Sequence, residues 1–366
     1  MTAHSAISRR RPDRPAQPPI RLMIVDDSQV ARAVLTRMVK VHRDFEVVAL
    51  AGTAQGALDA LKTVRVDAIL LDVEMPGVSG LEALPEIIRA GQGARVLIIS
   101  SMAEVGAETT VRALALGAAD ALPKPGIGNF AGRFAEVLAD RLRRIGRVDR
   151  DEMAVRTAEP SAPIHLRAMP GGALGCVALG ASTGGLSALF EFLRALPQRI
   201  EAPILVTQHL PVLFMPYFAR QLESASGRVA RVATDGEALR PDQIHVAPGD
   251  AHLCVARVDG AARVMLERKR APSGCLPSAD PMLASVASVY GAAGIGVMLS
   301  GMGRDGLSGA RRLVECGGAI LAQDRHSAAI WGMPRGVAEA GLASAVLPPA
   351  QLARRVAERA EAGPWR

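Results

Sequence analysis

Short apolar runs alternate with helix-like patterns along most of this chain. In the first half, such runs cover residues 22–25, 68–71 and 96–99, and polar residues follow each of them directly. Behind the first run, apolar residues recur at helical spacing from Val30 to Val39, after Ser28, which is a suitable helix N-cap. This alternation predicts parallel strands joined by crossover helices, hence a doubly wound α/β sheet.

The alternation stops near residue 140 and resumes after Gly175. Residues 141–172 are rich in Arg, contain Pro and show no sustained apolar period, which predicts a linker that is helical in its first third. Further apolar runs follow at residues 176–179, 204–207, 244–246, 295–299 and 319–322. We therefore expect a disordered Arg/Pro-rich tail at 1–20, an α/β domain at 21–140, the linker, and a second α/β domain at 173–366.

Length and composition agree with two folded domains. A chain of 366 residues with 49% hydrophobic residues is long enough for two separate cores, which excludes disorder as the main state. The uncharged stretches 168–190 and 282–303 are interrupted by Gly, Ser and Thr, so we interpret them as buried strand, turn and helix rather than membrane spans. The N-terminus lacks the apolar region of a secretory signal, and the four cysteines form no C-x-x-C pair. We expect a cytoplasmic protein with reduced, mostly buried cysteines.

The net charge of +7 does not indicate a nucleic-acid partner. Residues 1–21 carry a net charge of +4 and residues 141–170 carry +3, so the remaining sequence is balanced. Aromatic residues, on which single-stranded bases stack, make up only 3% of the chain. The basic character belongs to the tail and the linker, and we expect no nucleic-acid binding.

Acidic residues follow the first two apolar runs. Asp26 and Asp27 end the first run, and Asp72 ends the second, so all three converge at the carboxyl edge of the sheet. A single strand-end Asp often does no more than cap a helix, but three neighbouring carboxylates repel one another unless a cation lies between them. Mg²⁺ is the cation that such oxygen ligands favour. Lys124 and Ser100, at the ends of later strands, are placed to contact a phosphoryl group on one of these carboxylates.

These residues resemble the receiver domain of two-component response regulators, over residues 21–140. The resemblance rests on Val25-Asp26-Asp27-Ser28, Leu71-Asp72-Val73-Glu74-Met75-Pro76-Gly77, Ser100 and Lys124-Pro125. It implies a flavodoxin-like fold, phosphorylation of Asp72 by a histidine kinase, and Mg²⁺ held by Asp26, Asp27 and Asp72. Ala121 stands where such domains usually carry an aromatic switch residue, so the usual aromatic rotamer switch is not expected here.

A glycine-rich turn in the second half displays a serine. Gly180-Ala181-Ser182-Thr183-Gly184-Gly185 lies between an apolar run and a helix-like stretch, with the spacing of a G-x-S-x-G nucleophile elbow. The same turn is also compatible with phosphate binding or with a plain tight turn. If Ser182 is a nucleophile, it needs a base and an acid that orients the base.

His209 is the best-placed base, because it follows the run 204–207 and so lies at the same sheet edge as Ser182. The other histidines lie in the tail, the receiver-like half, the linker, a strand-like run or loops; they are His4, His42, His165, His245, His252 and His326. Two aspartates that follow later strands are candidates for the acid. Asp305 lies among glycines after the run 295–299, and Asp324 lies after the run 319–322.

This second half is similar to the catalytic domain of the chemotaxis protein-glutamate methylesterases, over residues 174–358. The shared motifs are Gly180-Ala181-Ser182-Thr183-Gly184-Gly185, Gln208-His209-Leu210-Pro211, Ala247-Pro248-Gly249-Asp250, Pro277-Ser278-Ala279-Asp280, Ser300-Gly301-Met302-Gly303-Arg304-Asp305-Gly306, Gln323-Asp324 and Gly332-Met333-Pro334-Arg335. The resemblance implies a Ser182, His209, Asp305 triad on a Rossmann-like doubly wound sheet, and so favours Asp305 over Asp324. It also implies that Thr183 lies beside the nucleophile and Met302 near the oxyanion site. The order Ser, His, Asp differs from that of α/β-hydrolases.

The resemblance implies a phosphorylation-regulated enzyme. It would hydrolyse glutamate γ-methyl esters on methyl-accepting chemotaxis receptors to glutamate and methanol, and deamidate receptor glutamines, with no cofactor for the esterase chemistry and no membrane insertion. The unphosphorylated receiver would cover the catalytic face. Two alternatives stay open from the residues alone: a serine hydrolase acting on a small ester, and a non-enzymatic regulator whose second domain binds a partner.

Overall fold

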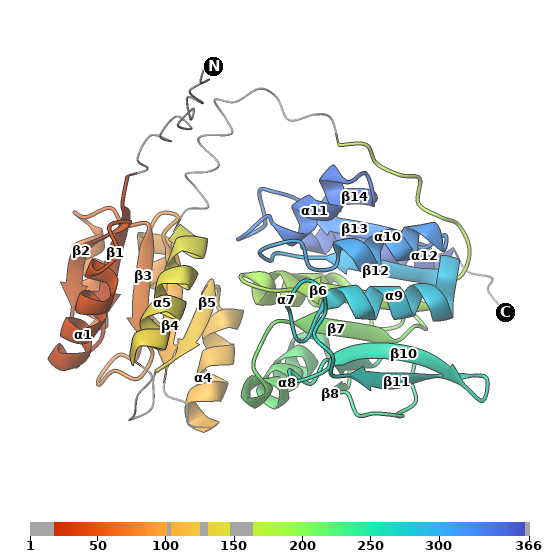
Figure 1. The fold of residues 1–366 in the computed structure, drawn as a ribbon, viewed down its shortest axis with the longest axis horizontal. Coiled ribbons are helices and arrows are strands. Elements are labelled where there is room, and N and C mark those ends of the chain that lie inside the picture. Colours follow the sequence, from red (N-terminus) through yellow and green to blue (C-terminus); the bar gives the residue numbers. More distant parts are fainter. Residues whose placement is uncertain (1–17, 101–103, 125–130, 147–163, 363–366) are drawn as a thin grey trace, which may run out of the picture.

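Two α/β domains lie side by side in the computed structural model (Figure 1). The structure describes residues 18–100, 104–124, 131–146 and 164–362. Most of the tail expected at 1–20 and of the linker expected at 141–172 lies outside these residues. Ile20 already begins the first strand and is fully buried, so the folded region starts slightly earlier than predicted.

The first domain is a five-stranded parallel sheet with the strand order β2-β1-β3-β4-β5. Its strands are β1 (Ile20–Val25), β2 (Phe45–Ala51), β3 (Ala68–Asp72), β4 (Arg95–Ser100) and β5 (Asp120–Pro123). Its helices are α1 (Gln29–Lys40), α2 (Ala54–Leu61), α3 (Gly80–Ala90), α4 (Glu104–Ala115) and α5 (Ala131–Gly146). This order is that of the flavodoxin-like folds, which confirms the predicted class.

Local sequence explains where these elements begin and end. Ser28 caps α1 by accepting a hydrogen bond from the backbone N–H of Ala31, as its position before the helical pattern predicts. All residues of β3 are buried, since helices cover both faces of a parallel sheet. Helix α5 continues to Gly146, so the start of the segment expected as a linker is helical.

The second domain has a seven-stranded parallel sheet with the order β14-β13-β12-β6-β7-β9-β8. Its strands are β6 (Cys176–Ala181), β7 (Ile204–Gln208), β8 (Ala230–Val232), β9 (Ile244–Val246), β12 (Gly294–Met298), β13 (Ala319–Gln323) and β14 (Ala343–Leu347). Its helices are α7 (Gly185–Ala195), α8 (Met215–Ser226), α9 (Ala279–Tyr290), α10 (Leu307–Glu315), α11 (Met333–Glu339) and α12 (Pro349–Glu361), with 3₁₀ turns η1 (Val212–Phe214) and η2 (Gly291–Ala293). An antiparallel hairpin of β10 (His252–Val258) and β11 (Ala261–Glu267), which the sequence pattern did not predict, lies outside this sheet.

The direction of the chain across this sheet reverses between β6 and β12. From β6 the chain moves outward through β7, whereas β12 and the strands after it build the opposite side. In open α/β sheets, ligands bind beyond the carboxyl ends of the strands at such a reversal. The fold therefore predicts a site at the loops that follow β6 and β12.

Helix α4 of the first domain packs against α7, α8 and η1 of the second (Figure 1). A single cluster of buried apolar residues includes Val111 and Leu114 of α4 together with Leu186 of α7 and Phe214 of η1. The backbone N–H of Gly184 also donates to the carbonyl of Ala119, at 2.8 Å. These contacts bring the first domain onto the loop after β6.

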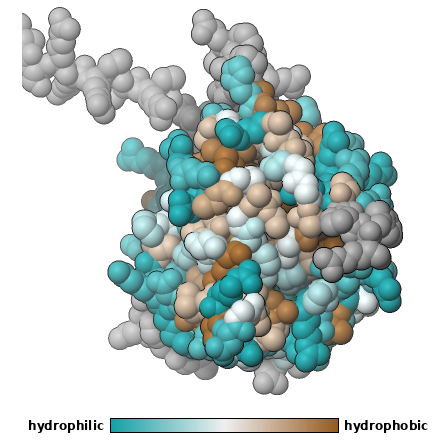
Figure 2. All heavy atoms as spheres, turned by 90° about the vertical axis from the view of Figure 1, so that its right-hand side faces the viewer, coloured by the Kyte–Doolittle hydropathy of each residue, from teal (hydrophilic) through white to brown (hydrophobic). Residues whose placement is uncertain are grey.

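The side of the second domain that faces away from the first carries both polar and apolar side chains. Apolar areas there are small and are separated by polar side chains (Figure 2). Among the helices of the described residues, none has the length and apolar character needed to cross a membrane.

Candidate active site and phosphoacceptor site

Ser182 directly follows β6 and begins a tight turn. The backbone of this turn requires a glycine two residues later, at Gly184. Gly184 has a φ of +70°, and a Cβ atom there would collide with Ala329. The backbone N–H of Ser182 donates to the Ser300 carbonyl at 3.0 Å, which ties this turn to the loop after β12. The turn holds Ser182, 8% exposed, at the carboxyl edge of the sheet.

His209 and Asp305 form a hydrogen-bonded pair beside this turn. His209 follows β7, and its Nε2 lies 2.9 Å from Oδ2 of Asp305. The buried Asp305 carboxylate also accepts hydrogen bonds from the Ala279 backbone N–H at 2.8 Å and from the hydroxyls of Ser273 at 3.0 Å and Ser278 at 2.5 Å. The acid is thus held firmly and aimed at the imidazole.

The pKa values of the two groups move apart. Burial lowers the pKa of His209, but interactions with Asp305 and with the Cys275 side chain outweigh it and raise the pKa to about 9. Burial raises the pKa of Asp305, but the hydrogen bond and charge of His209 and the donors around the carboxylate lower it to about 2. In the resting protein the pair is therefore an imidazolium and a carboxylate.

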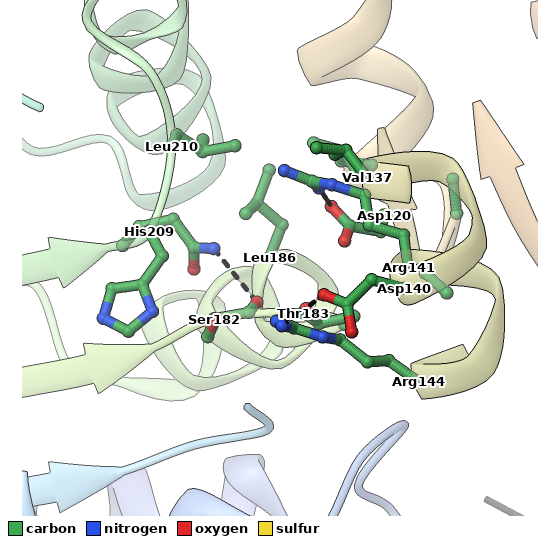
Figure 3. Close-up of a pocket in the computed structure, with 15 residues that line it drawn as sticks. Asp120, Val137, Asp140, Arg141, Arg144, Ser182, Thr183, Leu186, His209 and Leu210 are labelled. Atoms are coloured by element: carbon green, nitrogen blue, oxygen red, sulfur yellow. Dashed lines mark hydrogen bonds and ion pairs between the residues drawn. The ribbon is translucent and has the colours of Figure 1, made fainter. Parts of the chain in front are cut away.

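Since Nε2 of His209 is bonded to Asp305, Nδ1 is the ring nitrogen left for Ser182. Both side chains line the same cavity (Figure 3). Within the described residues, no hydrogen bond joins the Ser182 hydroxyl to His209. Such bonds often form only when substrate binds, so the three groups have the order of a nucleophile, a base and an acid without being fully aligned.

The three aspartates of the first domain also meet as predicted. Ligand atoms of Asp26, Asp27 and Asp72 lie within 4.8 Å of one another. Burial raises the pKa of Asp72 despite its 2.5 Å ion pair with Lys124. Oδ2 of Asp26 is buried and takes part in no hydrogen bond with the residues the structure describes. The Lys124 ammonium forms an ion pair with this oxygen at 3.5 Å, and the oxygen-rich set fits Mg²⁺.

Comparisons with known proteins match both halves of the chain. A CheB methylesterase model matches residues 177–356, and a response regulator receiver domain model matches residues 22–129. A protein-glutamate methylesterase/protein-glutamine glutaminase of Paramagnetospirillum magneticum is 37% identical over 93% of this chain and 96% of that protein. One of Caulobacter vibrioides is 41% identical over 93% of this chain and 99% of that protein.

The chain belongs to the CheB methylesterase family. The crystal structure of the CheB methylesterase catalytic domain of Thermotoga maritima is similar to the second domain, with 34% sequence identity and a TM-score of 0.50 over 51% of this chain and 98% of that one. The family assignment agrees with the receiver and Rossmann-like folds expected for the two halves.

In this family member, both domains wall the cavity that contains Ser182. The cavity has a volume of about 290 Å³, with Ser182, Thr183 and His209 on one side. Across from them lie Arg141 and Arg144 of α5 (Figure 3). Arg141 is ion-paired with Asp120 at 2.5 Å. The receiver thus limits the space available to a substrate at the serine.

Two glutamines that the sequence reasoning did not propose as site residues hold the turn that contains Ser182. Gln208 Nε2 donates to the Ser182 carbonyl at 3.0 Å. Gln323 Oε1 accepts from the backbone N–H of Ser300, whose hydroxyl donates to the Thr183 carbonyl at 2.9 Å. Each glutamine is the last residue of a buried strand, which is the signal that could have found it.

Other predicted residues lie in different places. Met302 belongs to the loop of Asp305 and is 40% exposed. Asp324, the rival acid, accepts hydrogen bonds from the backbone of His326 and from Ser327, so it forms a local turn. His252 does not lie in a loop as expected but begins β10, where it is fully buried and accepts a hydrogen bond from the Ser278 backbone.

In the receiver domain, the Ser100 side chain is hydrogen-bonded to helix α4 of the same domain. Its hydroxyl lies 2.6 Å from that of Thr110 on α4, and both residues are buried. The Lys124 ammonium donates to Oδ2 of Asp72, at 2.5 Å. Movement of Ser100 toward a phosphoryl group would therefore break a contact with the helix that packs on the catalytic domain.

Proposed function

We propose that this chain is a phosphorylation-regulated protein-glutamate methylesterase that uses Ser182, His209 and Asp305. It hydrolyses glutamate γ-methyl esters on methyl-accepting chemotaxis receptors and deamidates receptor glutamines. The observation that carries the proposal is the pair formed by the partly buried His209 and the buried Asp305 beside Ser182, at the point where strand order reverses.

The reaction follows from the roles of these side chains. Nδ1 of neutral His209 takes the proton of the Ser182 hydroxyl as its oxygen attacks the ester carbonyl. Asp305 holds the ring and stabilises the imidazolium that forms. His209 then gives the proton to the departing methoxide, and methanol leaves. Water, activated by His209, releases glutamate from the acyl-enzyme; with glutamine the first product is ammonia.

Backbone N–H groups of the Thr183 turn and of the Met302 loop are the proposed donors to the oxyanion. In the closed arrangement, the N–H of Gly184 in this turn is already bonded to the Ala119 carbonyl of the receiver. Closure therefore occupies a donor next to the nucleophile in addition to narrowing the cavity.

Phosphorylation of Asp72 is proposed to shift the population toward an open arrangement. Asp26, Asp27 and Asp72 would hold Mg²⁺, which supplies charge neutralisation for phosphoryl transfer, and Lys124 and Ser100 would contact the phosphoryl oxygens. The phosphodonor is a chemotaxis histidine kinase. We place the protein in the cytoplasm, where receptor helices and kinase are both accessible.

A serine-directed phosphonate tests the enzymatic part of the proposal. Peptide mapping is expected to find the adduct on Ser182 and to find more of it after addition of a phosphodonor. Absence of any adduct on Ser182 would favour a non-enzymatic output domain. Hydrolysis of small esters without methanol release from methylated receptors would favour the other serine hydrolase.

The raised pKa of His209 predicts an alkaline activity profile. Below a pH of about 9 the imidazole carries its proton and cannot act as a base, so kcat/KM is expected to rise as pH increases through this value. Initial rates of methanol release between pH 6 and 10 measure this pH dependence. Methylated receptors without the enzyme, at each pH, give the rate of spontaneous ester hydrolysis. A midpoint at the ordinary histidine value near 6.5 would contradict the pairing with Asp305.

An ion pair across the domain interface offers a test of closure. Arg220 of α8 lies 3.8 Å from Glu108 of α4, and both are exposed, so the pair contributes less than about 1 kcal/mol. Glu108→Arg is expected to raise basal activity by up to about fivefold, because two arginines would then face each other.

Two controls separate this effect from general damage. The double variant Glu108→Arg/Arg220→Glu is expected to restore the basal rate, since the pair is reversed but intact. Glu339→Arg breaks a comparable exposed pair with Arg335 inside the catalytic domain and should leave the rate unaltered. Equal rates for all variants would argue against closure at α4 and α8.

A further inference from the structure

Cys275 brings a third metal-ligating group to the His209–Asp305 pair. The ligand atoms of His209, Cys275 and Asp305 lie within 4.8 Å of one another. They come from three separate loops, after β7, before α9 and after β12. The esterase chemistry described above uses the histidine and the aspartate but gives the thiol no role.

We propose that these three residues form an inhibitory binding site for Zn²⁺ or a similar transition-metal ion. The inference rests on the proposed function only for its consequence, inhibition. The binding site itself depends on the three side chains and is independent of whether Ser182 is a nucleophile.

The chemistry of the set differs from that of the receiver's acidic cluster. Imidazole nitrogen, thiolate sulfur and carboxylate oxygen are ligands that favour Zn²⁺, whereas Asp26, Asp27 and Asp72 offer only oxygen and favour Mg²⁺. One imidazole, one thiolate and one carboxylate also balance the charge of a divalent ion. The two clusters are therefore expected to select different metals.

The geometry needs only a small adjustment. In a tetrahedral zinc site the nitrogen and oxygen ligands lie about 3.4 Å apart, so Nε2 of His209 and Oδ2 of Asp305 must separate by about half an ångström from 2.9 Å. Cys275 is only partly buried, so an ion entering from solvent can reach its thiol.

Neighbouring groups already orient the carboxylate. The hydroxyls of Ser273 and Ser278 donate to Oδ1 of Asp305, and the Ala279 N–H donates to Oδ2. Hydrogen bonds of this kind fix metal-bound carboxylates in place and are part of a built metal site. The other lone pair of Oδ2 accepts from His209 in the metal-free pair and becomes available to an ion when the two groups separate.

Metal binding would inhibit the enzyme through the tautomer of His209. An ion on Nε2 takes the lone pair of that nitrogen, so the neutral ring carries its proton on Nδ1. Nδ1 is the nitrogen that must accept the Ser182 proton. The bound metal therefore removes the base and separates it from Asp305 in one step.

Cobalt absorption spectroscopy of the full chain tests binding directly, with excess Mg²⁺ present to occupy the acidic cluster. Added Co²⁺ is expected to produce a thiolate-to-cobalt charge-transfer band, and Cys275→Ser should abolish it. Cys316→Ser removes the other partly buried cysteine, which caps α10, and should retain the band. Absence of the band in the unaltered chain, or its persistence in Cys275→Ser, would overturn the site.

Inhibition is measured as the ratio of methanol release without and with Zn²⁺, so that each variant is its own reference. Loss of a ligand weakens metal affinity by at least about tenfold, and Cys275→Ser is expected to need that much more Zn²⁺ for half-inhibition. Equal sensitivity of Cys275→Ser and Cys316→Ser would contradict the proposal. If no variant releases methanol, the proposed function fails while the cobalt band still decides the metal site.

Discussion

Replacing Ser182 with alanine is expected to reduce methanol release from methylated receptors by at least about a thousandfold. The hydroxyl is the only atom group removed, and without it the acyl-enzyme cannot form. The fold should persist, because the turn is held by backbone contacts to Ser300 and by Gln208 rather than by the hydroxyl. Methanol release and circular dichroism of the same preparation measure both properties.

Ser187→Ala is the matched control for this variant. Ser187 lies in the first turn of α7, and its hydroxyl is bonded only to the Gly184 carbonyl among the described residues. Its replacement should leave turnover near that of the unaltered chain. Near-normal turnover of Ser182→Ala would overturn the nucleophile assignment, whereas loss of activity in both variants would point to damage of α7.

Replacing Asp72 with asparagine is expected to abolish activation by a phosphodonor while basal activity persists. A phosphodonor should raise the rate of the unaltered chain at least about tenfold by populating the open arrangement, and the variant should change by less than about twofold. Asparagine keeps the size of the side chain but cannot accept the phosphoryl group. Rates with and without a small-molecule phosphodonor and Mg²⁺ measure the effect.

Asp59→Asn is the control that tests whether removing a different carboxylate from the receiver domain also abolishes activation. Asp59 lies on the exposed surface of α2 and pairs with Lys62, away from the acidic cluster. Activation of this variant should equal that of the unaltered chain. Undiminished activation of Asp72→Asn would remove Asp72 from the mechanism.

The apolar runs predicted most of both sheets because they are buried on both faces. Strands such as β3 and β13 are wholly buried, so they read as continuous apolar stretches with a polar residue at the end. Because the strands of a parallel sheet all end at the same edge, that polar residue lies at the carboxyl edge of the sheet. Asp72 and His209 could be located in this way from the amino-acid sequence alone.

Elements exposed on one face were harder to predict. Strand β2 lies at the edge of its sheet, and its apolar run at residues 47–51 is only partly buried; the β10–β11 hairpin also contains an apolar run, at residues 253–256, but lies outside the main sheet. The hairpin matters because the loop after it carries the groups that surround Asp305. Ser278 and Cys275 come close to Asp305 only through this long-range packing, which a local sequence pattern does not predict.

The contact between the two domains likewise could not be predicted from the pattern of residues alone. The expectation that the receiver covers the catalytic face came from the family resemblance, and the structure adds the elements involved. Helix α4 carries Val111 and Leu114 into a cluster shared with the catalytic domain. On a helix that also packs on its own sheet, these apolar positions look like ordinary core residues, so the sequence does not distinguish the two uses.

Methanol release from methylated receptor membranes, followed with and without a phosphodonor, decides whether this chain is a phosphorylation-regulated methylesterase. We expect methanol in proportion to the ester groups lost, at a low rate that rises on phosphorylation and falls to the receptor-only level in Ser182→Ala. If the unaltered chain with phosphodonor releases methanol no faster than the receptors alone, the chain is not a phosphorylation-regulated methylesterase.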